Sequence, residues 1–193
     1  MLSIKTLSTV LLAAAAAATV SAAPTNTVGN NTKTPSRTTH LTGVTHSVVA
    51  GLGGLRFDPD NVVAEIGDVV EWHFLPRNHS VVQSSFADPC VPLADGTSFF
   101  SGFNFFTPEG QADNVFQVVV EDRKPIWYYC AQNVGQHCSS GMVGVVNQNF
   151  DSPDFTLAKH KALAAQKGDA IVPPVQQGGH VIPNPNPLGG FKL

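Results

Sequence analysis

Hydrophobic and polar residues alternate in short runs between residues 46 and 150, a pattern typical of β-strands. Runs rich in Val, Ile, Phe, Trp and Tyr are separated by Gly, Pro, Asn and Asp: HSVVAG, GLRFDP, NVVAEIGDVVEWHFL, HSVVQSSF, NVFQVVVED, PIWYYCAQ and GMVGVVN. In VVEWHFL, alternation places Val70, Trp72 and Phe74 on one face and His73 on the other, where we expect it to face solvent. The pattern predicts an all-β domain, a Greek-key β-sandwich of about seven or eight antiparallel strands.

Three segments outside this region carry different patterns. DSPDFTLAKHKALAAQKG, residues 151–168, predicts a short C-terminal helix capped by Asp151 or Ser152. Residues 23–45 are rich in Thr, Asn and Ser and predict a linker, because they hold too few apolar side chains to form a core. Repeated Pro-Asn and Gly-Gly predict a disordered tail over residues 169–193.

One segment, Ala87 to Asp113, interrupts the strand pattern with Pro, Gly and five Phe residues. Loops of this length usually cover a core or carry a function. We expect its Phe side chains to complete the edge of the core, with an apolar rim beside a site as the alternative.

The first 22 residues are typical of a secretory signal peptide. Lys5 precedes the apolar run LSTVLLAAAAAATV, and the small residues Val20–Ala22 suit cleavage. The run is too short and Ala-rich for a membrane anchor, and we expect no GPI-attachment signal at the C-terminus. The sequence therefore predicts a secreted protein, extracellular or in the cell wall, with a glycan acceptor at Asn30 in the sequon NNT.

Charge and motifs exclude several classes of function. The chain has 14 acidic and 11 basic residues, so it lacks the basic surplus that nucleic-acid binding requires. It contains neither the Gly-x-Ser-x-Gly motif of hydrolases nor the His-Glu-x-x-His motif of metalloproteases. It also lacks paired His-x-His motifs, which hold the additional coppers of oxidases. We therefore predict that it is not an enzyme.

The candidate chemistry lies in YYCAQNVGQHCSSGMVG, Tyr128–Gly144, which holds two of the three cysteines. One cysteine stays unpaired after a single disulfide, and outside the cell a free thiol is oxidised unless it is buried or occupied. A Cys90–Cys138 bridge leaves Cys130, at the end of an apolar strand, as the free thiol. The other two pairings leave a thiol on an exposed loop, so we favour the first.

Cys130, His137 and Met142 form a soft ligand set, and such sets select copper over hard cations. A second imidazole must come from elsewhere in the fold. His79, at the start of an earlier strand, can supply it, and His73 is a nearby alternative. Two His and one Cys with a distant Met describe a type 1 copper site.

The stretches Asn78–Cys90 and Trp127–Asn147, with FDPDNVVAEIGDVVEWHF, resemble the cupredoxins, above all the small secreted cupredoxin-like proteins of fungi that are related to plant phytocyanins. The resemblance covers about His46–Asn147. It implies a cupredoxin-like fold and one type 1 copper ion. It implies that the ligands are His79, Cys130, His137 and Met142, and that Cys90 and Cys138 form a disulfide.

The chain departs from the family in one place. Six residues separate Cys130 from His137, a longer connection than in phytocyanins and plastocyanins, which predicts a more adjustable copper geometry. Met142, where some relatives have Gln, favours Cu(I) and a higher potential. Asn78 and Ser80 are candidates for hydrogen bonds that hold the ligand loops. Asn78 also begins the sequon NHS, which we expect to be unused because a glycan would crowd the copper.

The resulting hypothesis is a monomeric carrier of single electrons that exchanges them with a redox partner protein or a small reductant. No membrane span and no nucleic-acid partner are expected. The alternative is a redox-idle copper buffer, or a cell-wall or host-interaction protein, on the same scaffold, because a fold does not determine its function.

Overall fold

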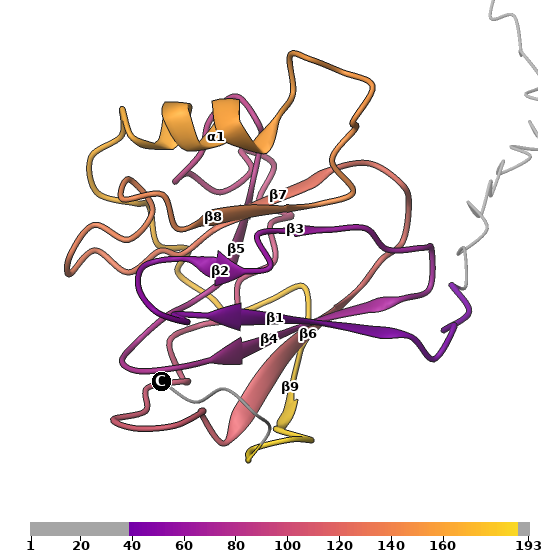
Figure 1. Ribbon diagram of the computed structural model, residues 1–193, viewed down its shortest axis with the longest axis vertical. Helices are drawn as coiled ribbons and strands as arrows, with labels where there is room; N and C mark the ends of the chain where they lie inside the picture. Colours follow the sequence, from indigo (N-terminus) through magenta and orange to yellow (C-terminus); the bar gives the residue numbers. More distant parts are fainter. Residues whose placement is uncertain (1–38, 189–193) are drawn as a thin grey trace, which may run out of the picture. The chain divides into compact units, whose positions relative to one another are not determined.

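Two β-sheets and one helix make up the structure, a computed structural model that describes residues 39–188 (Figure 1). The predicted signal peptide, Asn30 and most of the predicted linker lie outside the described residues, as do residues 189–193. The first sheet has the order β2-β1-β4-β6-β9, formed by Phe57–Asp58, Thr45–Ala50, Val69–Phe74, Asn114–Val119 and His180–Pro183. The second has the order β3-β8-β7-β5, formed by Asn61–Val62, Val143–Val146, Ile126–Tyr129 and Val82–Ser84.

The predicted two-sheet sandwich is confirmed, but two of its strand pairs are parallel. β1 pairs with β4 in parallel, with Val48 opposite Trp72, and β3 pairs with β8 in the same sense. Parallel neighbours need a crossover connection, and residues 51–68, which include β2 and β3, provide it between β1 and β4. Alternation shows which face of a strand is buried but not the direction of its neighbour, so this feature could not be predicted from the pattern.

The core between the sheets is built from aromatic side chains. The predicted inward face of β4 is confirmed, because Val70, Trp72 and Phe74 are all buried. Trp72 and Tyr128 from opposite sheets meet edge to face, with ring centroids 5.3 Å apart, and the rings of Phe57 and Tyr128 also meet edge to face, with centroids 5.0 Å apart. Such pairs contribute beyond their buried area and hold the two sheets in one packing.

The prediction that His73 faces solvent is wrong. Only 3% of His73 is exposed, and its Nε2 lies 2.8 Å from Glu71 Oε1. Its Nδ1 lies 2.9 Å from Gln111 Oε1, which also accepts a hydrogen bond from Asn184 at 3.0 Å. The C-terminal segment therefore covers the polar face of β4, and the buried polar groups satisfy one another there.

The prediction of a disordered tail is wrong for much of the segment after residue 169. β9 pairs antiparallel with β6, from His180 opposite Gln117 to Pro183 opposite Asn114, at the edge of the first sheet (Figure 1). Upstream, the Gln177 and Phe100 backbones exchange hydrogen bonds. Pro-Asn and Gly-Gly repeats carry no strand signal, so contacts with the domain, rather than local propensity, order this segment.

The predicted C-terminal helix is present but shorter. α1 spans Leu157–Ala164 and lies over the four-stranded sheet, beside β8 (Figure 1). Its N-cap is Thr156, whose hydroxyl accepts from the Lys159 N–H at 3.2 Å. Ser152 and Asp151 therefore lie before the helix instead of capping it. At the other end of the domain, the Thr42 hydroxyl donates to Asp68 at 2.6 Å, so the fold begins within the predicted linker.

The Phe-rich segment between β5 and β6 mainly completes the core. Phe99, Phe100 and Phe105 are buried, and Phe105 stacks on Phe74 with ring centroids 4.0 Å apart. Phe106 is the exception, since 64% of it is exposed. Within residues 39–188, no helix has the length and hydrophobicity needed to cross a membrane.

Gly144 in β8 allows the closest approach in this core. A Cβ built on Gly144 would lie 2.4 Å from Cζ of the fully buried Tyr128 ring. We expect Gly144→Ala to lower the free energy of unfolding by roughly 1–3 kcal/mol, because the ring has no space to move. Urea denaturation of the metal-free protein measures this. Gly168→Ala, where a Cβ meets nothing within 4 Å, is the control and should change stability little.

Because of His160 in α1, we expect the free energy of unfolding to decrease in acid. His160 is fully buried against Trp127, and burial lowers its pKa to about 4, although its Nδ1 bonds to the Phe86 carbonyl. Between about pH 6.5 and 4 the unfolded chain binds a proton that the folded one does not, so stability falls as pH falls, by up to about 1.4 kcal/mol per pH unit for this group. His160→Phe should flatten this slope in urea titrations compared at each pH. Parallel curves for the two proteins would contradict the assignment.

Candidate metal centre

Strand pairing brings three ligand-type side chains to one end of the sandwich. β5 and β7 are antiparallel, with Val82 opposite Tyr129, so residues just before β5 lie beside residues just after β7. β7 and β8 are also antiparallel, with Tyr129 opposite Val143. The Cys130 N–H continues this ladder by donating to the Met142 carbonyl at 3.0 Å. The predicted ligands therefore come from three neighbouring chain segments.

His79, Cys130 and His137 form the one group of three or more close His, Cys, Asp or Glu side chains with metal-ligand geometry in the described part of the chain. Their donor atoms all lie within 4.8 Å of one another. Cys130 Sγ is 3.4 Å from His137 Nδ1 and 4.0 Å from His79 Nδ1. The exposed fractions of His79, Cys130 and His137 are 2%, 0% and 7%. The group is therefore almost fully shielded from water.

Met142 lies beside this group in the core. It is fully buried in the same hydrophobic cluster as Cys130. Its N–H donates to the His137 carbonyl at 3.0 Å, and its own carbonyl accepts from Cys130. Its backbone thus joins two of the predicted ligands, and its role as axial ligand stays a prediction.

Ser80 holds Cys130 in place. The Ser80 N–H donates to Cys130 Sγ at 3.4 Å, and the Ser80 hydroxyl accepts from the Ala131 N–H at 3.0 Å. Asn78 is half-buried, and its side-chain oxygen has no hydrogen-bond partner among the described residues. The structure thus gives Ser80 the contacts expected of a residue that supports a ligand, whereas the role predicted for Asn78 stays a prediction.

Burial keeps all three side chains uncharged in the metal-free protein. It raises the pKa of Cys130 to about 11, opposed by the hydrogen bonds from Ser80. It lowers the pKa of His137 to about 4, with His79 as a second cause. It also lowers the pKa of His79, opposed by the Pro76 carbonyl, which lies 3.3 Å from His79 Nε2. A carbonyl accepts, so Nε2 of His79 carries the proton and its Nδ1 offers a lone pair towards Cys130.

This donor set fits a soft metal ion. Two neutral imidazoles and one thiol converge with no carboxylate among them, a combination that suits copper better than calcium or magnesium. A bound cation would lower the pKa of the thiol and stabilise the thiolate.

Two proteins of one fungus are similar in sequence to this chain. No protein-family model matches the chain. An extracellular serine-rich protein of Arthroderma benhamiae is 35% identical over 125 residues, which are 64% of this chain and 47% of that protein. A probable GPI-anchored cupredoxin of the same fungus is 34% identical over 126 residues, 65% of this chain and 61% of that protein. The chain thus spans less than two thirds of either relative.

The domain is similar in sequence to a fungal protein named a cupredoxin. The resemblance to fungal cupredoxins predicted from the sequence is confirmed by the second relative. Among solved structures, native pseudoazurin from Hyphomicrobium denitrificans has a TM-score of 0.39 and 20% identity, covering 64% of this chain and 98% of that one. Reduced auracyanin from Roseiflexus castenholzii has a TM-score of 0.38 and 16% identity, covering 53% of this chain and 94% of that one.

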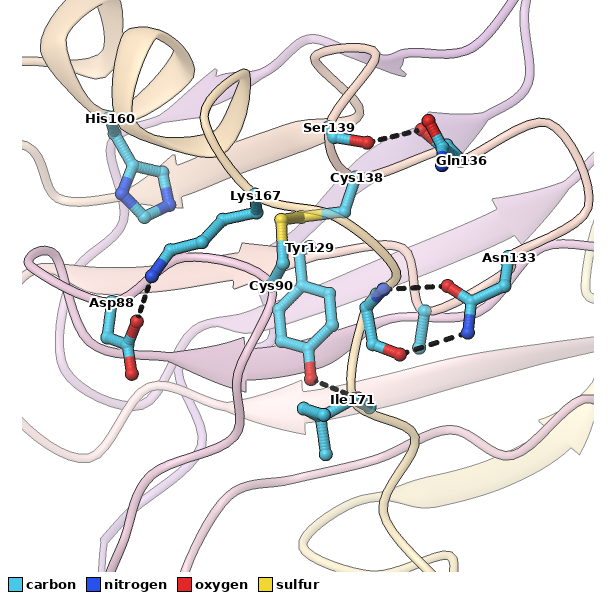
Figure 2. Close-up of a disulfide and its surroundings, with 12 residues drawn as sticks. Asp88, Cys90, Tyr129, Asn133, Gln136, Cys138, Ser139, His160, Lys167 and Ile171 are labelled. Carbon is cyan, nitrogen blue, oxygen red and sulfur yellow. Dashed lines mark hydrogen bonds and ion pairs between the residues drawn. A yellow bond between two sulfur atoms is a disulfide. The ribbon is translucent and has the colours of Figure 1, made fainter.

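The predicted disulfide is confirmed. Cys90 and Cys138 are bridged (Figure 2). Cys130 is the free thiol, and it is buried. The bridge closes a separation of 48 residues, which in the chain-entropy description is worth about 4 kcal/mol. Because Cys138 follows His137 directly, the bridge also ties the His137 loop to the Phe-rich segment.

Gly51 is a site residue that the sequence reasoning missed. It follows β1 with a φ of 96°, and a Cβ there would lie 2.5 Å from His79 Nε2. Only glycine combines this backbone conformation with so close an approach of the imidazole. The Ala-Gly step that ends HSVVAG was the available signal, but a turn explains it equally well.

An apolar groove with a volume of about 450 Å³ lies beside His79 and His137. Phe106, Val134 and Leu55 supply exposed apolar surface to it, and Val134 is 82% exposed. Phe106 is the one Phe of the Phe-rich segment that lines this groove. The alternative prediction, that Phe side chains of this segment form an apolar rim beside a site, therefore applies to one of the five Phe residues.

The Cys130 thiol should be chemically inert in the metal-free fold. With a pKa of about 11, it holds roughly 200-fold less thiolate at pH 8 than an ordinary cysteine, and it is also shielded from solvent. We expect iodoacetamide to modify the native protein at least that much more slowly than the urea-unfolded chain with its disulfide intact. Mass spectrometry counts the single adduct. Equal rates in the two states would contradict the buried site.

Proposed function

We propose that this cupredoxin-like domain binds one copper ion of type 1 through His79, Cys130 and His137, with Met142 as axial ligand, and carries single electrons. The observation that supports this most directly is the convergence of one buried thiol with two neutral imidazoles, with donor atoms within 4.8 Å of one another. A thiolate, two imidazoles and a weak thioether form the ligand set of a blue-copper electron-transfer site.

Copper, when bound, supplies one-electron chemistry by alternating between Cu(I) and Cu(II). The protein's contribution is to keep the ligands in place while the charge changes. The Ser80 N–H stabilises negative charge on Cys130 Sγ, and the Pro76 carbonyl fixes the ring of His79. The His137 N–H donates a hydrogen bond to the Gln132 carbonyl, and the His137 carbonyl accepts one from the Met142 N–H. Ligands held this firmly move little, which favours rapid electron exchange.

The groove beside His137 supports exchange with a redox partner. His137 is the most exposed of the three ligands and opens to a surface lined by Phe106 and Val134. Electron-transfer complexes are typically small, below about 1,200 Å² of buried surface, and short-lived. A compact apolar patch suits such an encounter with a redox protein or a small reductant.

We further propose a carrier located outside the cell, rather than an enzyme. The ligands are at most 7% exposed, which leaves little room for a substrate to reach an ion held between them. The disulfide, the predicted signal peptide and the relatives named extracellular and GPI-anchored support an extracellular or cell-surface location.

The deciding experiment is metal analysis and visible spectroscopy of the oxidised protein. We expect one copper per chain and an intense thiolate-to-copper band near ~600 nm. Cys130→Ser should abolish the band because the thiolate is lost. His180→Ala, at an exposed histidine of β9, is the matched control and should leave the band unchanged.

Two other results would change the conclusion. A protein that binds no copper, or binds it without the band, would contradict the type 1 site. A copper protein with tight Cu(I) binding but sluggish exchange with small redox proteins would instead be the redox-idle buffer.

A further inference from the structure

We propose that the segment after α1, residues 165–171, here called the C-terminal strap, positions the loop that carries His137, and that Asn133 is the positioning residue through which it acts. The effect on copper binding rests on the proposed function, whereas the effect on the loop does not.

Asn133 binds the strap with both polar atoms of its side chain. Its amide N–H donates to the Ala170 carbonyl at 3.0 Å, and its oxygen accepts from the Ala170 N–H at 2.7 Å (Figure 2). The side chain therefore pairs with the strap backbone as a neighbouring strand would. Ala170 is buried, so few water molecules can replace these bonds.

Ile171 adds two further hydrogen bonds next to this pair. The hydroxyl of the buried Tyr129 donates to the Ile171 carbonyl at 2.6 Å (Figure 2). The Ile171 N–H donates to the Cys90 carbonyl at 2.8 Å. The strap thus has four hydrogen bonds within two residues of its backbone.

Each attachment lies next to a ligand or between two ligands. Tyr129 directly precedes Cys130, and Asn133 lies between Cys130 and His137. Cys90 is bonded to Cys138, which directly follows His137. The strap therefore holds the ligand loop before its first ligand, in its middle and, through the disulfide, just after its second.

The length of this loop explains why it needs support. Six residues connect Cys130 to His137, and Gly135 and Gln136 both have positive φ, 88° and 50°. Inside the loop, the Gln136 N–H donates to the Asn133 carbonyl and the His137 N–H donates to the Gln132 carbonyl. Fixing Asn133 from outside therefore fixes the turn that orients His137.

The strap is itself anchored. Ala164 at the end of α1 and Ala170 are buried in one cluster with Tyr129 and both bridged cysteines. The Lys167 ammonium pairs with Asp88 at 2.5 Å (Figure 2). Since Lys167 and Asp88 are both partly exposed, this pair contributes little energy, and the apolar cluster holds the strap.

Asn133→Ala is the test, with Gln177→Ala as matched control. Gln177 also uses a side-chain amide to make two hydrogen bonds from the C-terminal segment to backbone, at Gly96 and Ser98. In the metal-free protein, we expect Asn133→Ala to accelerate hydrogen exchange of the amides of residues 132–137, whereas Gln177→Ala leaves them unchanged. This readout needs no copper, so it stands even if the proposed function fails.

The second readout uses the copper-loaded protein. Substitution of a residue that supports a metal ligand typically lowers metal affinity by 10–100-fold. We therefore expect Asn133→Ala to bind copper at least about tenfold more weakly and to shift the ~600 nm band. Asn133→Asp keeps the acceptor for the Ala170 N–H but sets a carboxylate oxygen against the Ala170 carbonyl, so it should not restore the wild-type affinity. Tyr129→Phe removes only the hydroxyl that donates a hydrogen bond to the Ile171 carbonyl, and it is the second variant if Asn133→Ala does not fold.

Loop amides that exchange at wild-type rates in Asn133→Ala would overturn the proposal. Equal acceleration in Gln177→Ala would also overturn it, because the effect would then be a general loss of stability. If the wild type binds no copper, the proposed function fails, while the exchange comparison still decides whether the strap positions the loop.

Discussion

Strand β7 is hydrogen-bonded on both sides, to β5 and to β8, and the register of these pairings decides which side chains meet beyond its end. Val82 lies opposite Tyr129, and Tyr129 lies opposite Val143, so the segment that carries His79 and the residue Met142 are both brought to the end of β7, where Cys130 follows. A shift of one residue in either pairing would turn the side chains of the strand to the opposite face. The large buried rings of Trp72 and Tyr128 oppose such a shift, because each fits one packing between the sheets. Packing between the two sheets thus helps to determine the geometry of the site.

The side chains of the site must be stable without charge in the buried, metal-free fold and must also be able to bind a cation. Burial keeps Cys130 a neutral thiol and His79 and His137 neutral imidazoles, so none of these three buried groups carries an uncompensated charge in the metal-free fold. The same three groups become good ligands as soon as a cation replaces the thiol proton. The protein can therefore fold before it is loaded, and an ion that enters finds its ligands already close together. Gly51 and Ser80 complete this arrangement, one by leaving space for the imidazole and the other by donating to sulfur.

The segments after β8 are part of the domain rather than an appendage. α1 covers the four-stranded sheet, the strap contacts the ligand loop, and β9 extends the other sheet (Figure 1). The same segment thus covers the buried Glu71–His73 pair on one sheet and supports the His137 loop beside the other. The C-terminal strap thus gives the loop between Cys130 and His137 hydrogen bonds from outside, in addition to those within the loop.

The sequence by itself determined what depends on local pattern and on residue chemistry. Alternation predicted the inward face of β4, thiol chemistry outside the cell favoured the Cys90–Cys138 bridge, and the soft side chains predicted which residues would gather. Only the tertiary structure decided the features that depend on contacts between distant segments. It buried His73 under the C-terminal segment, made β1 and β4 parallel, and placed Gly51 against His79 and Asn133 against Ala170. Such contacts join residues that lie far apart in the chain. The residues next to each partner in the sequence do not indicate the contact, so a local sequence pattern cannot predict it.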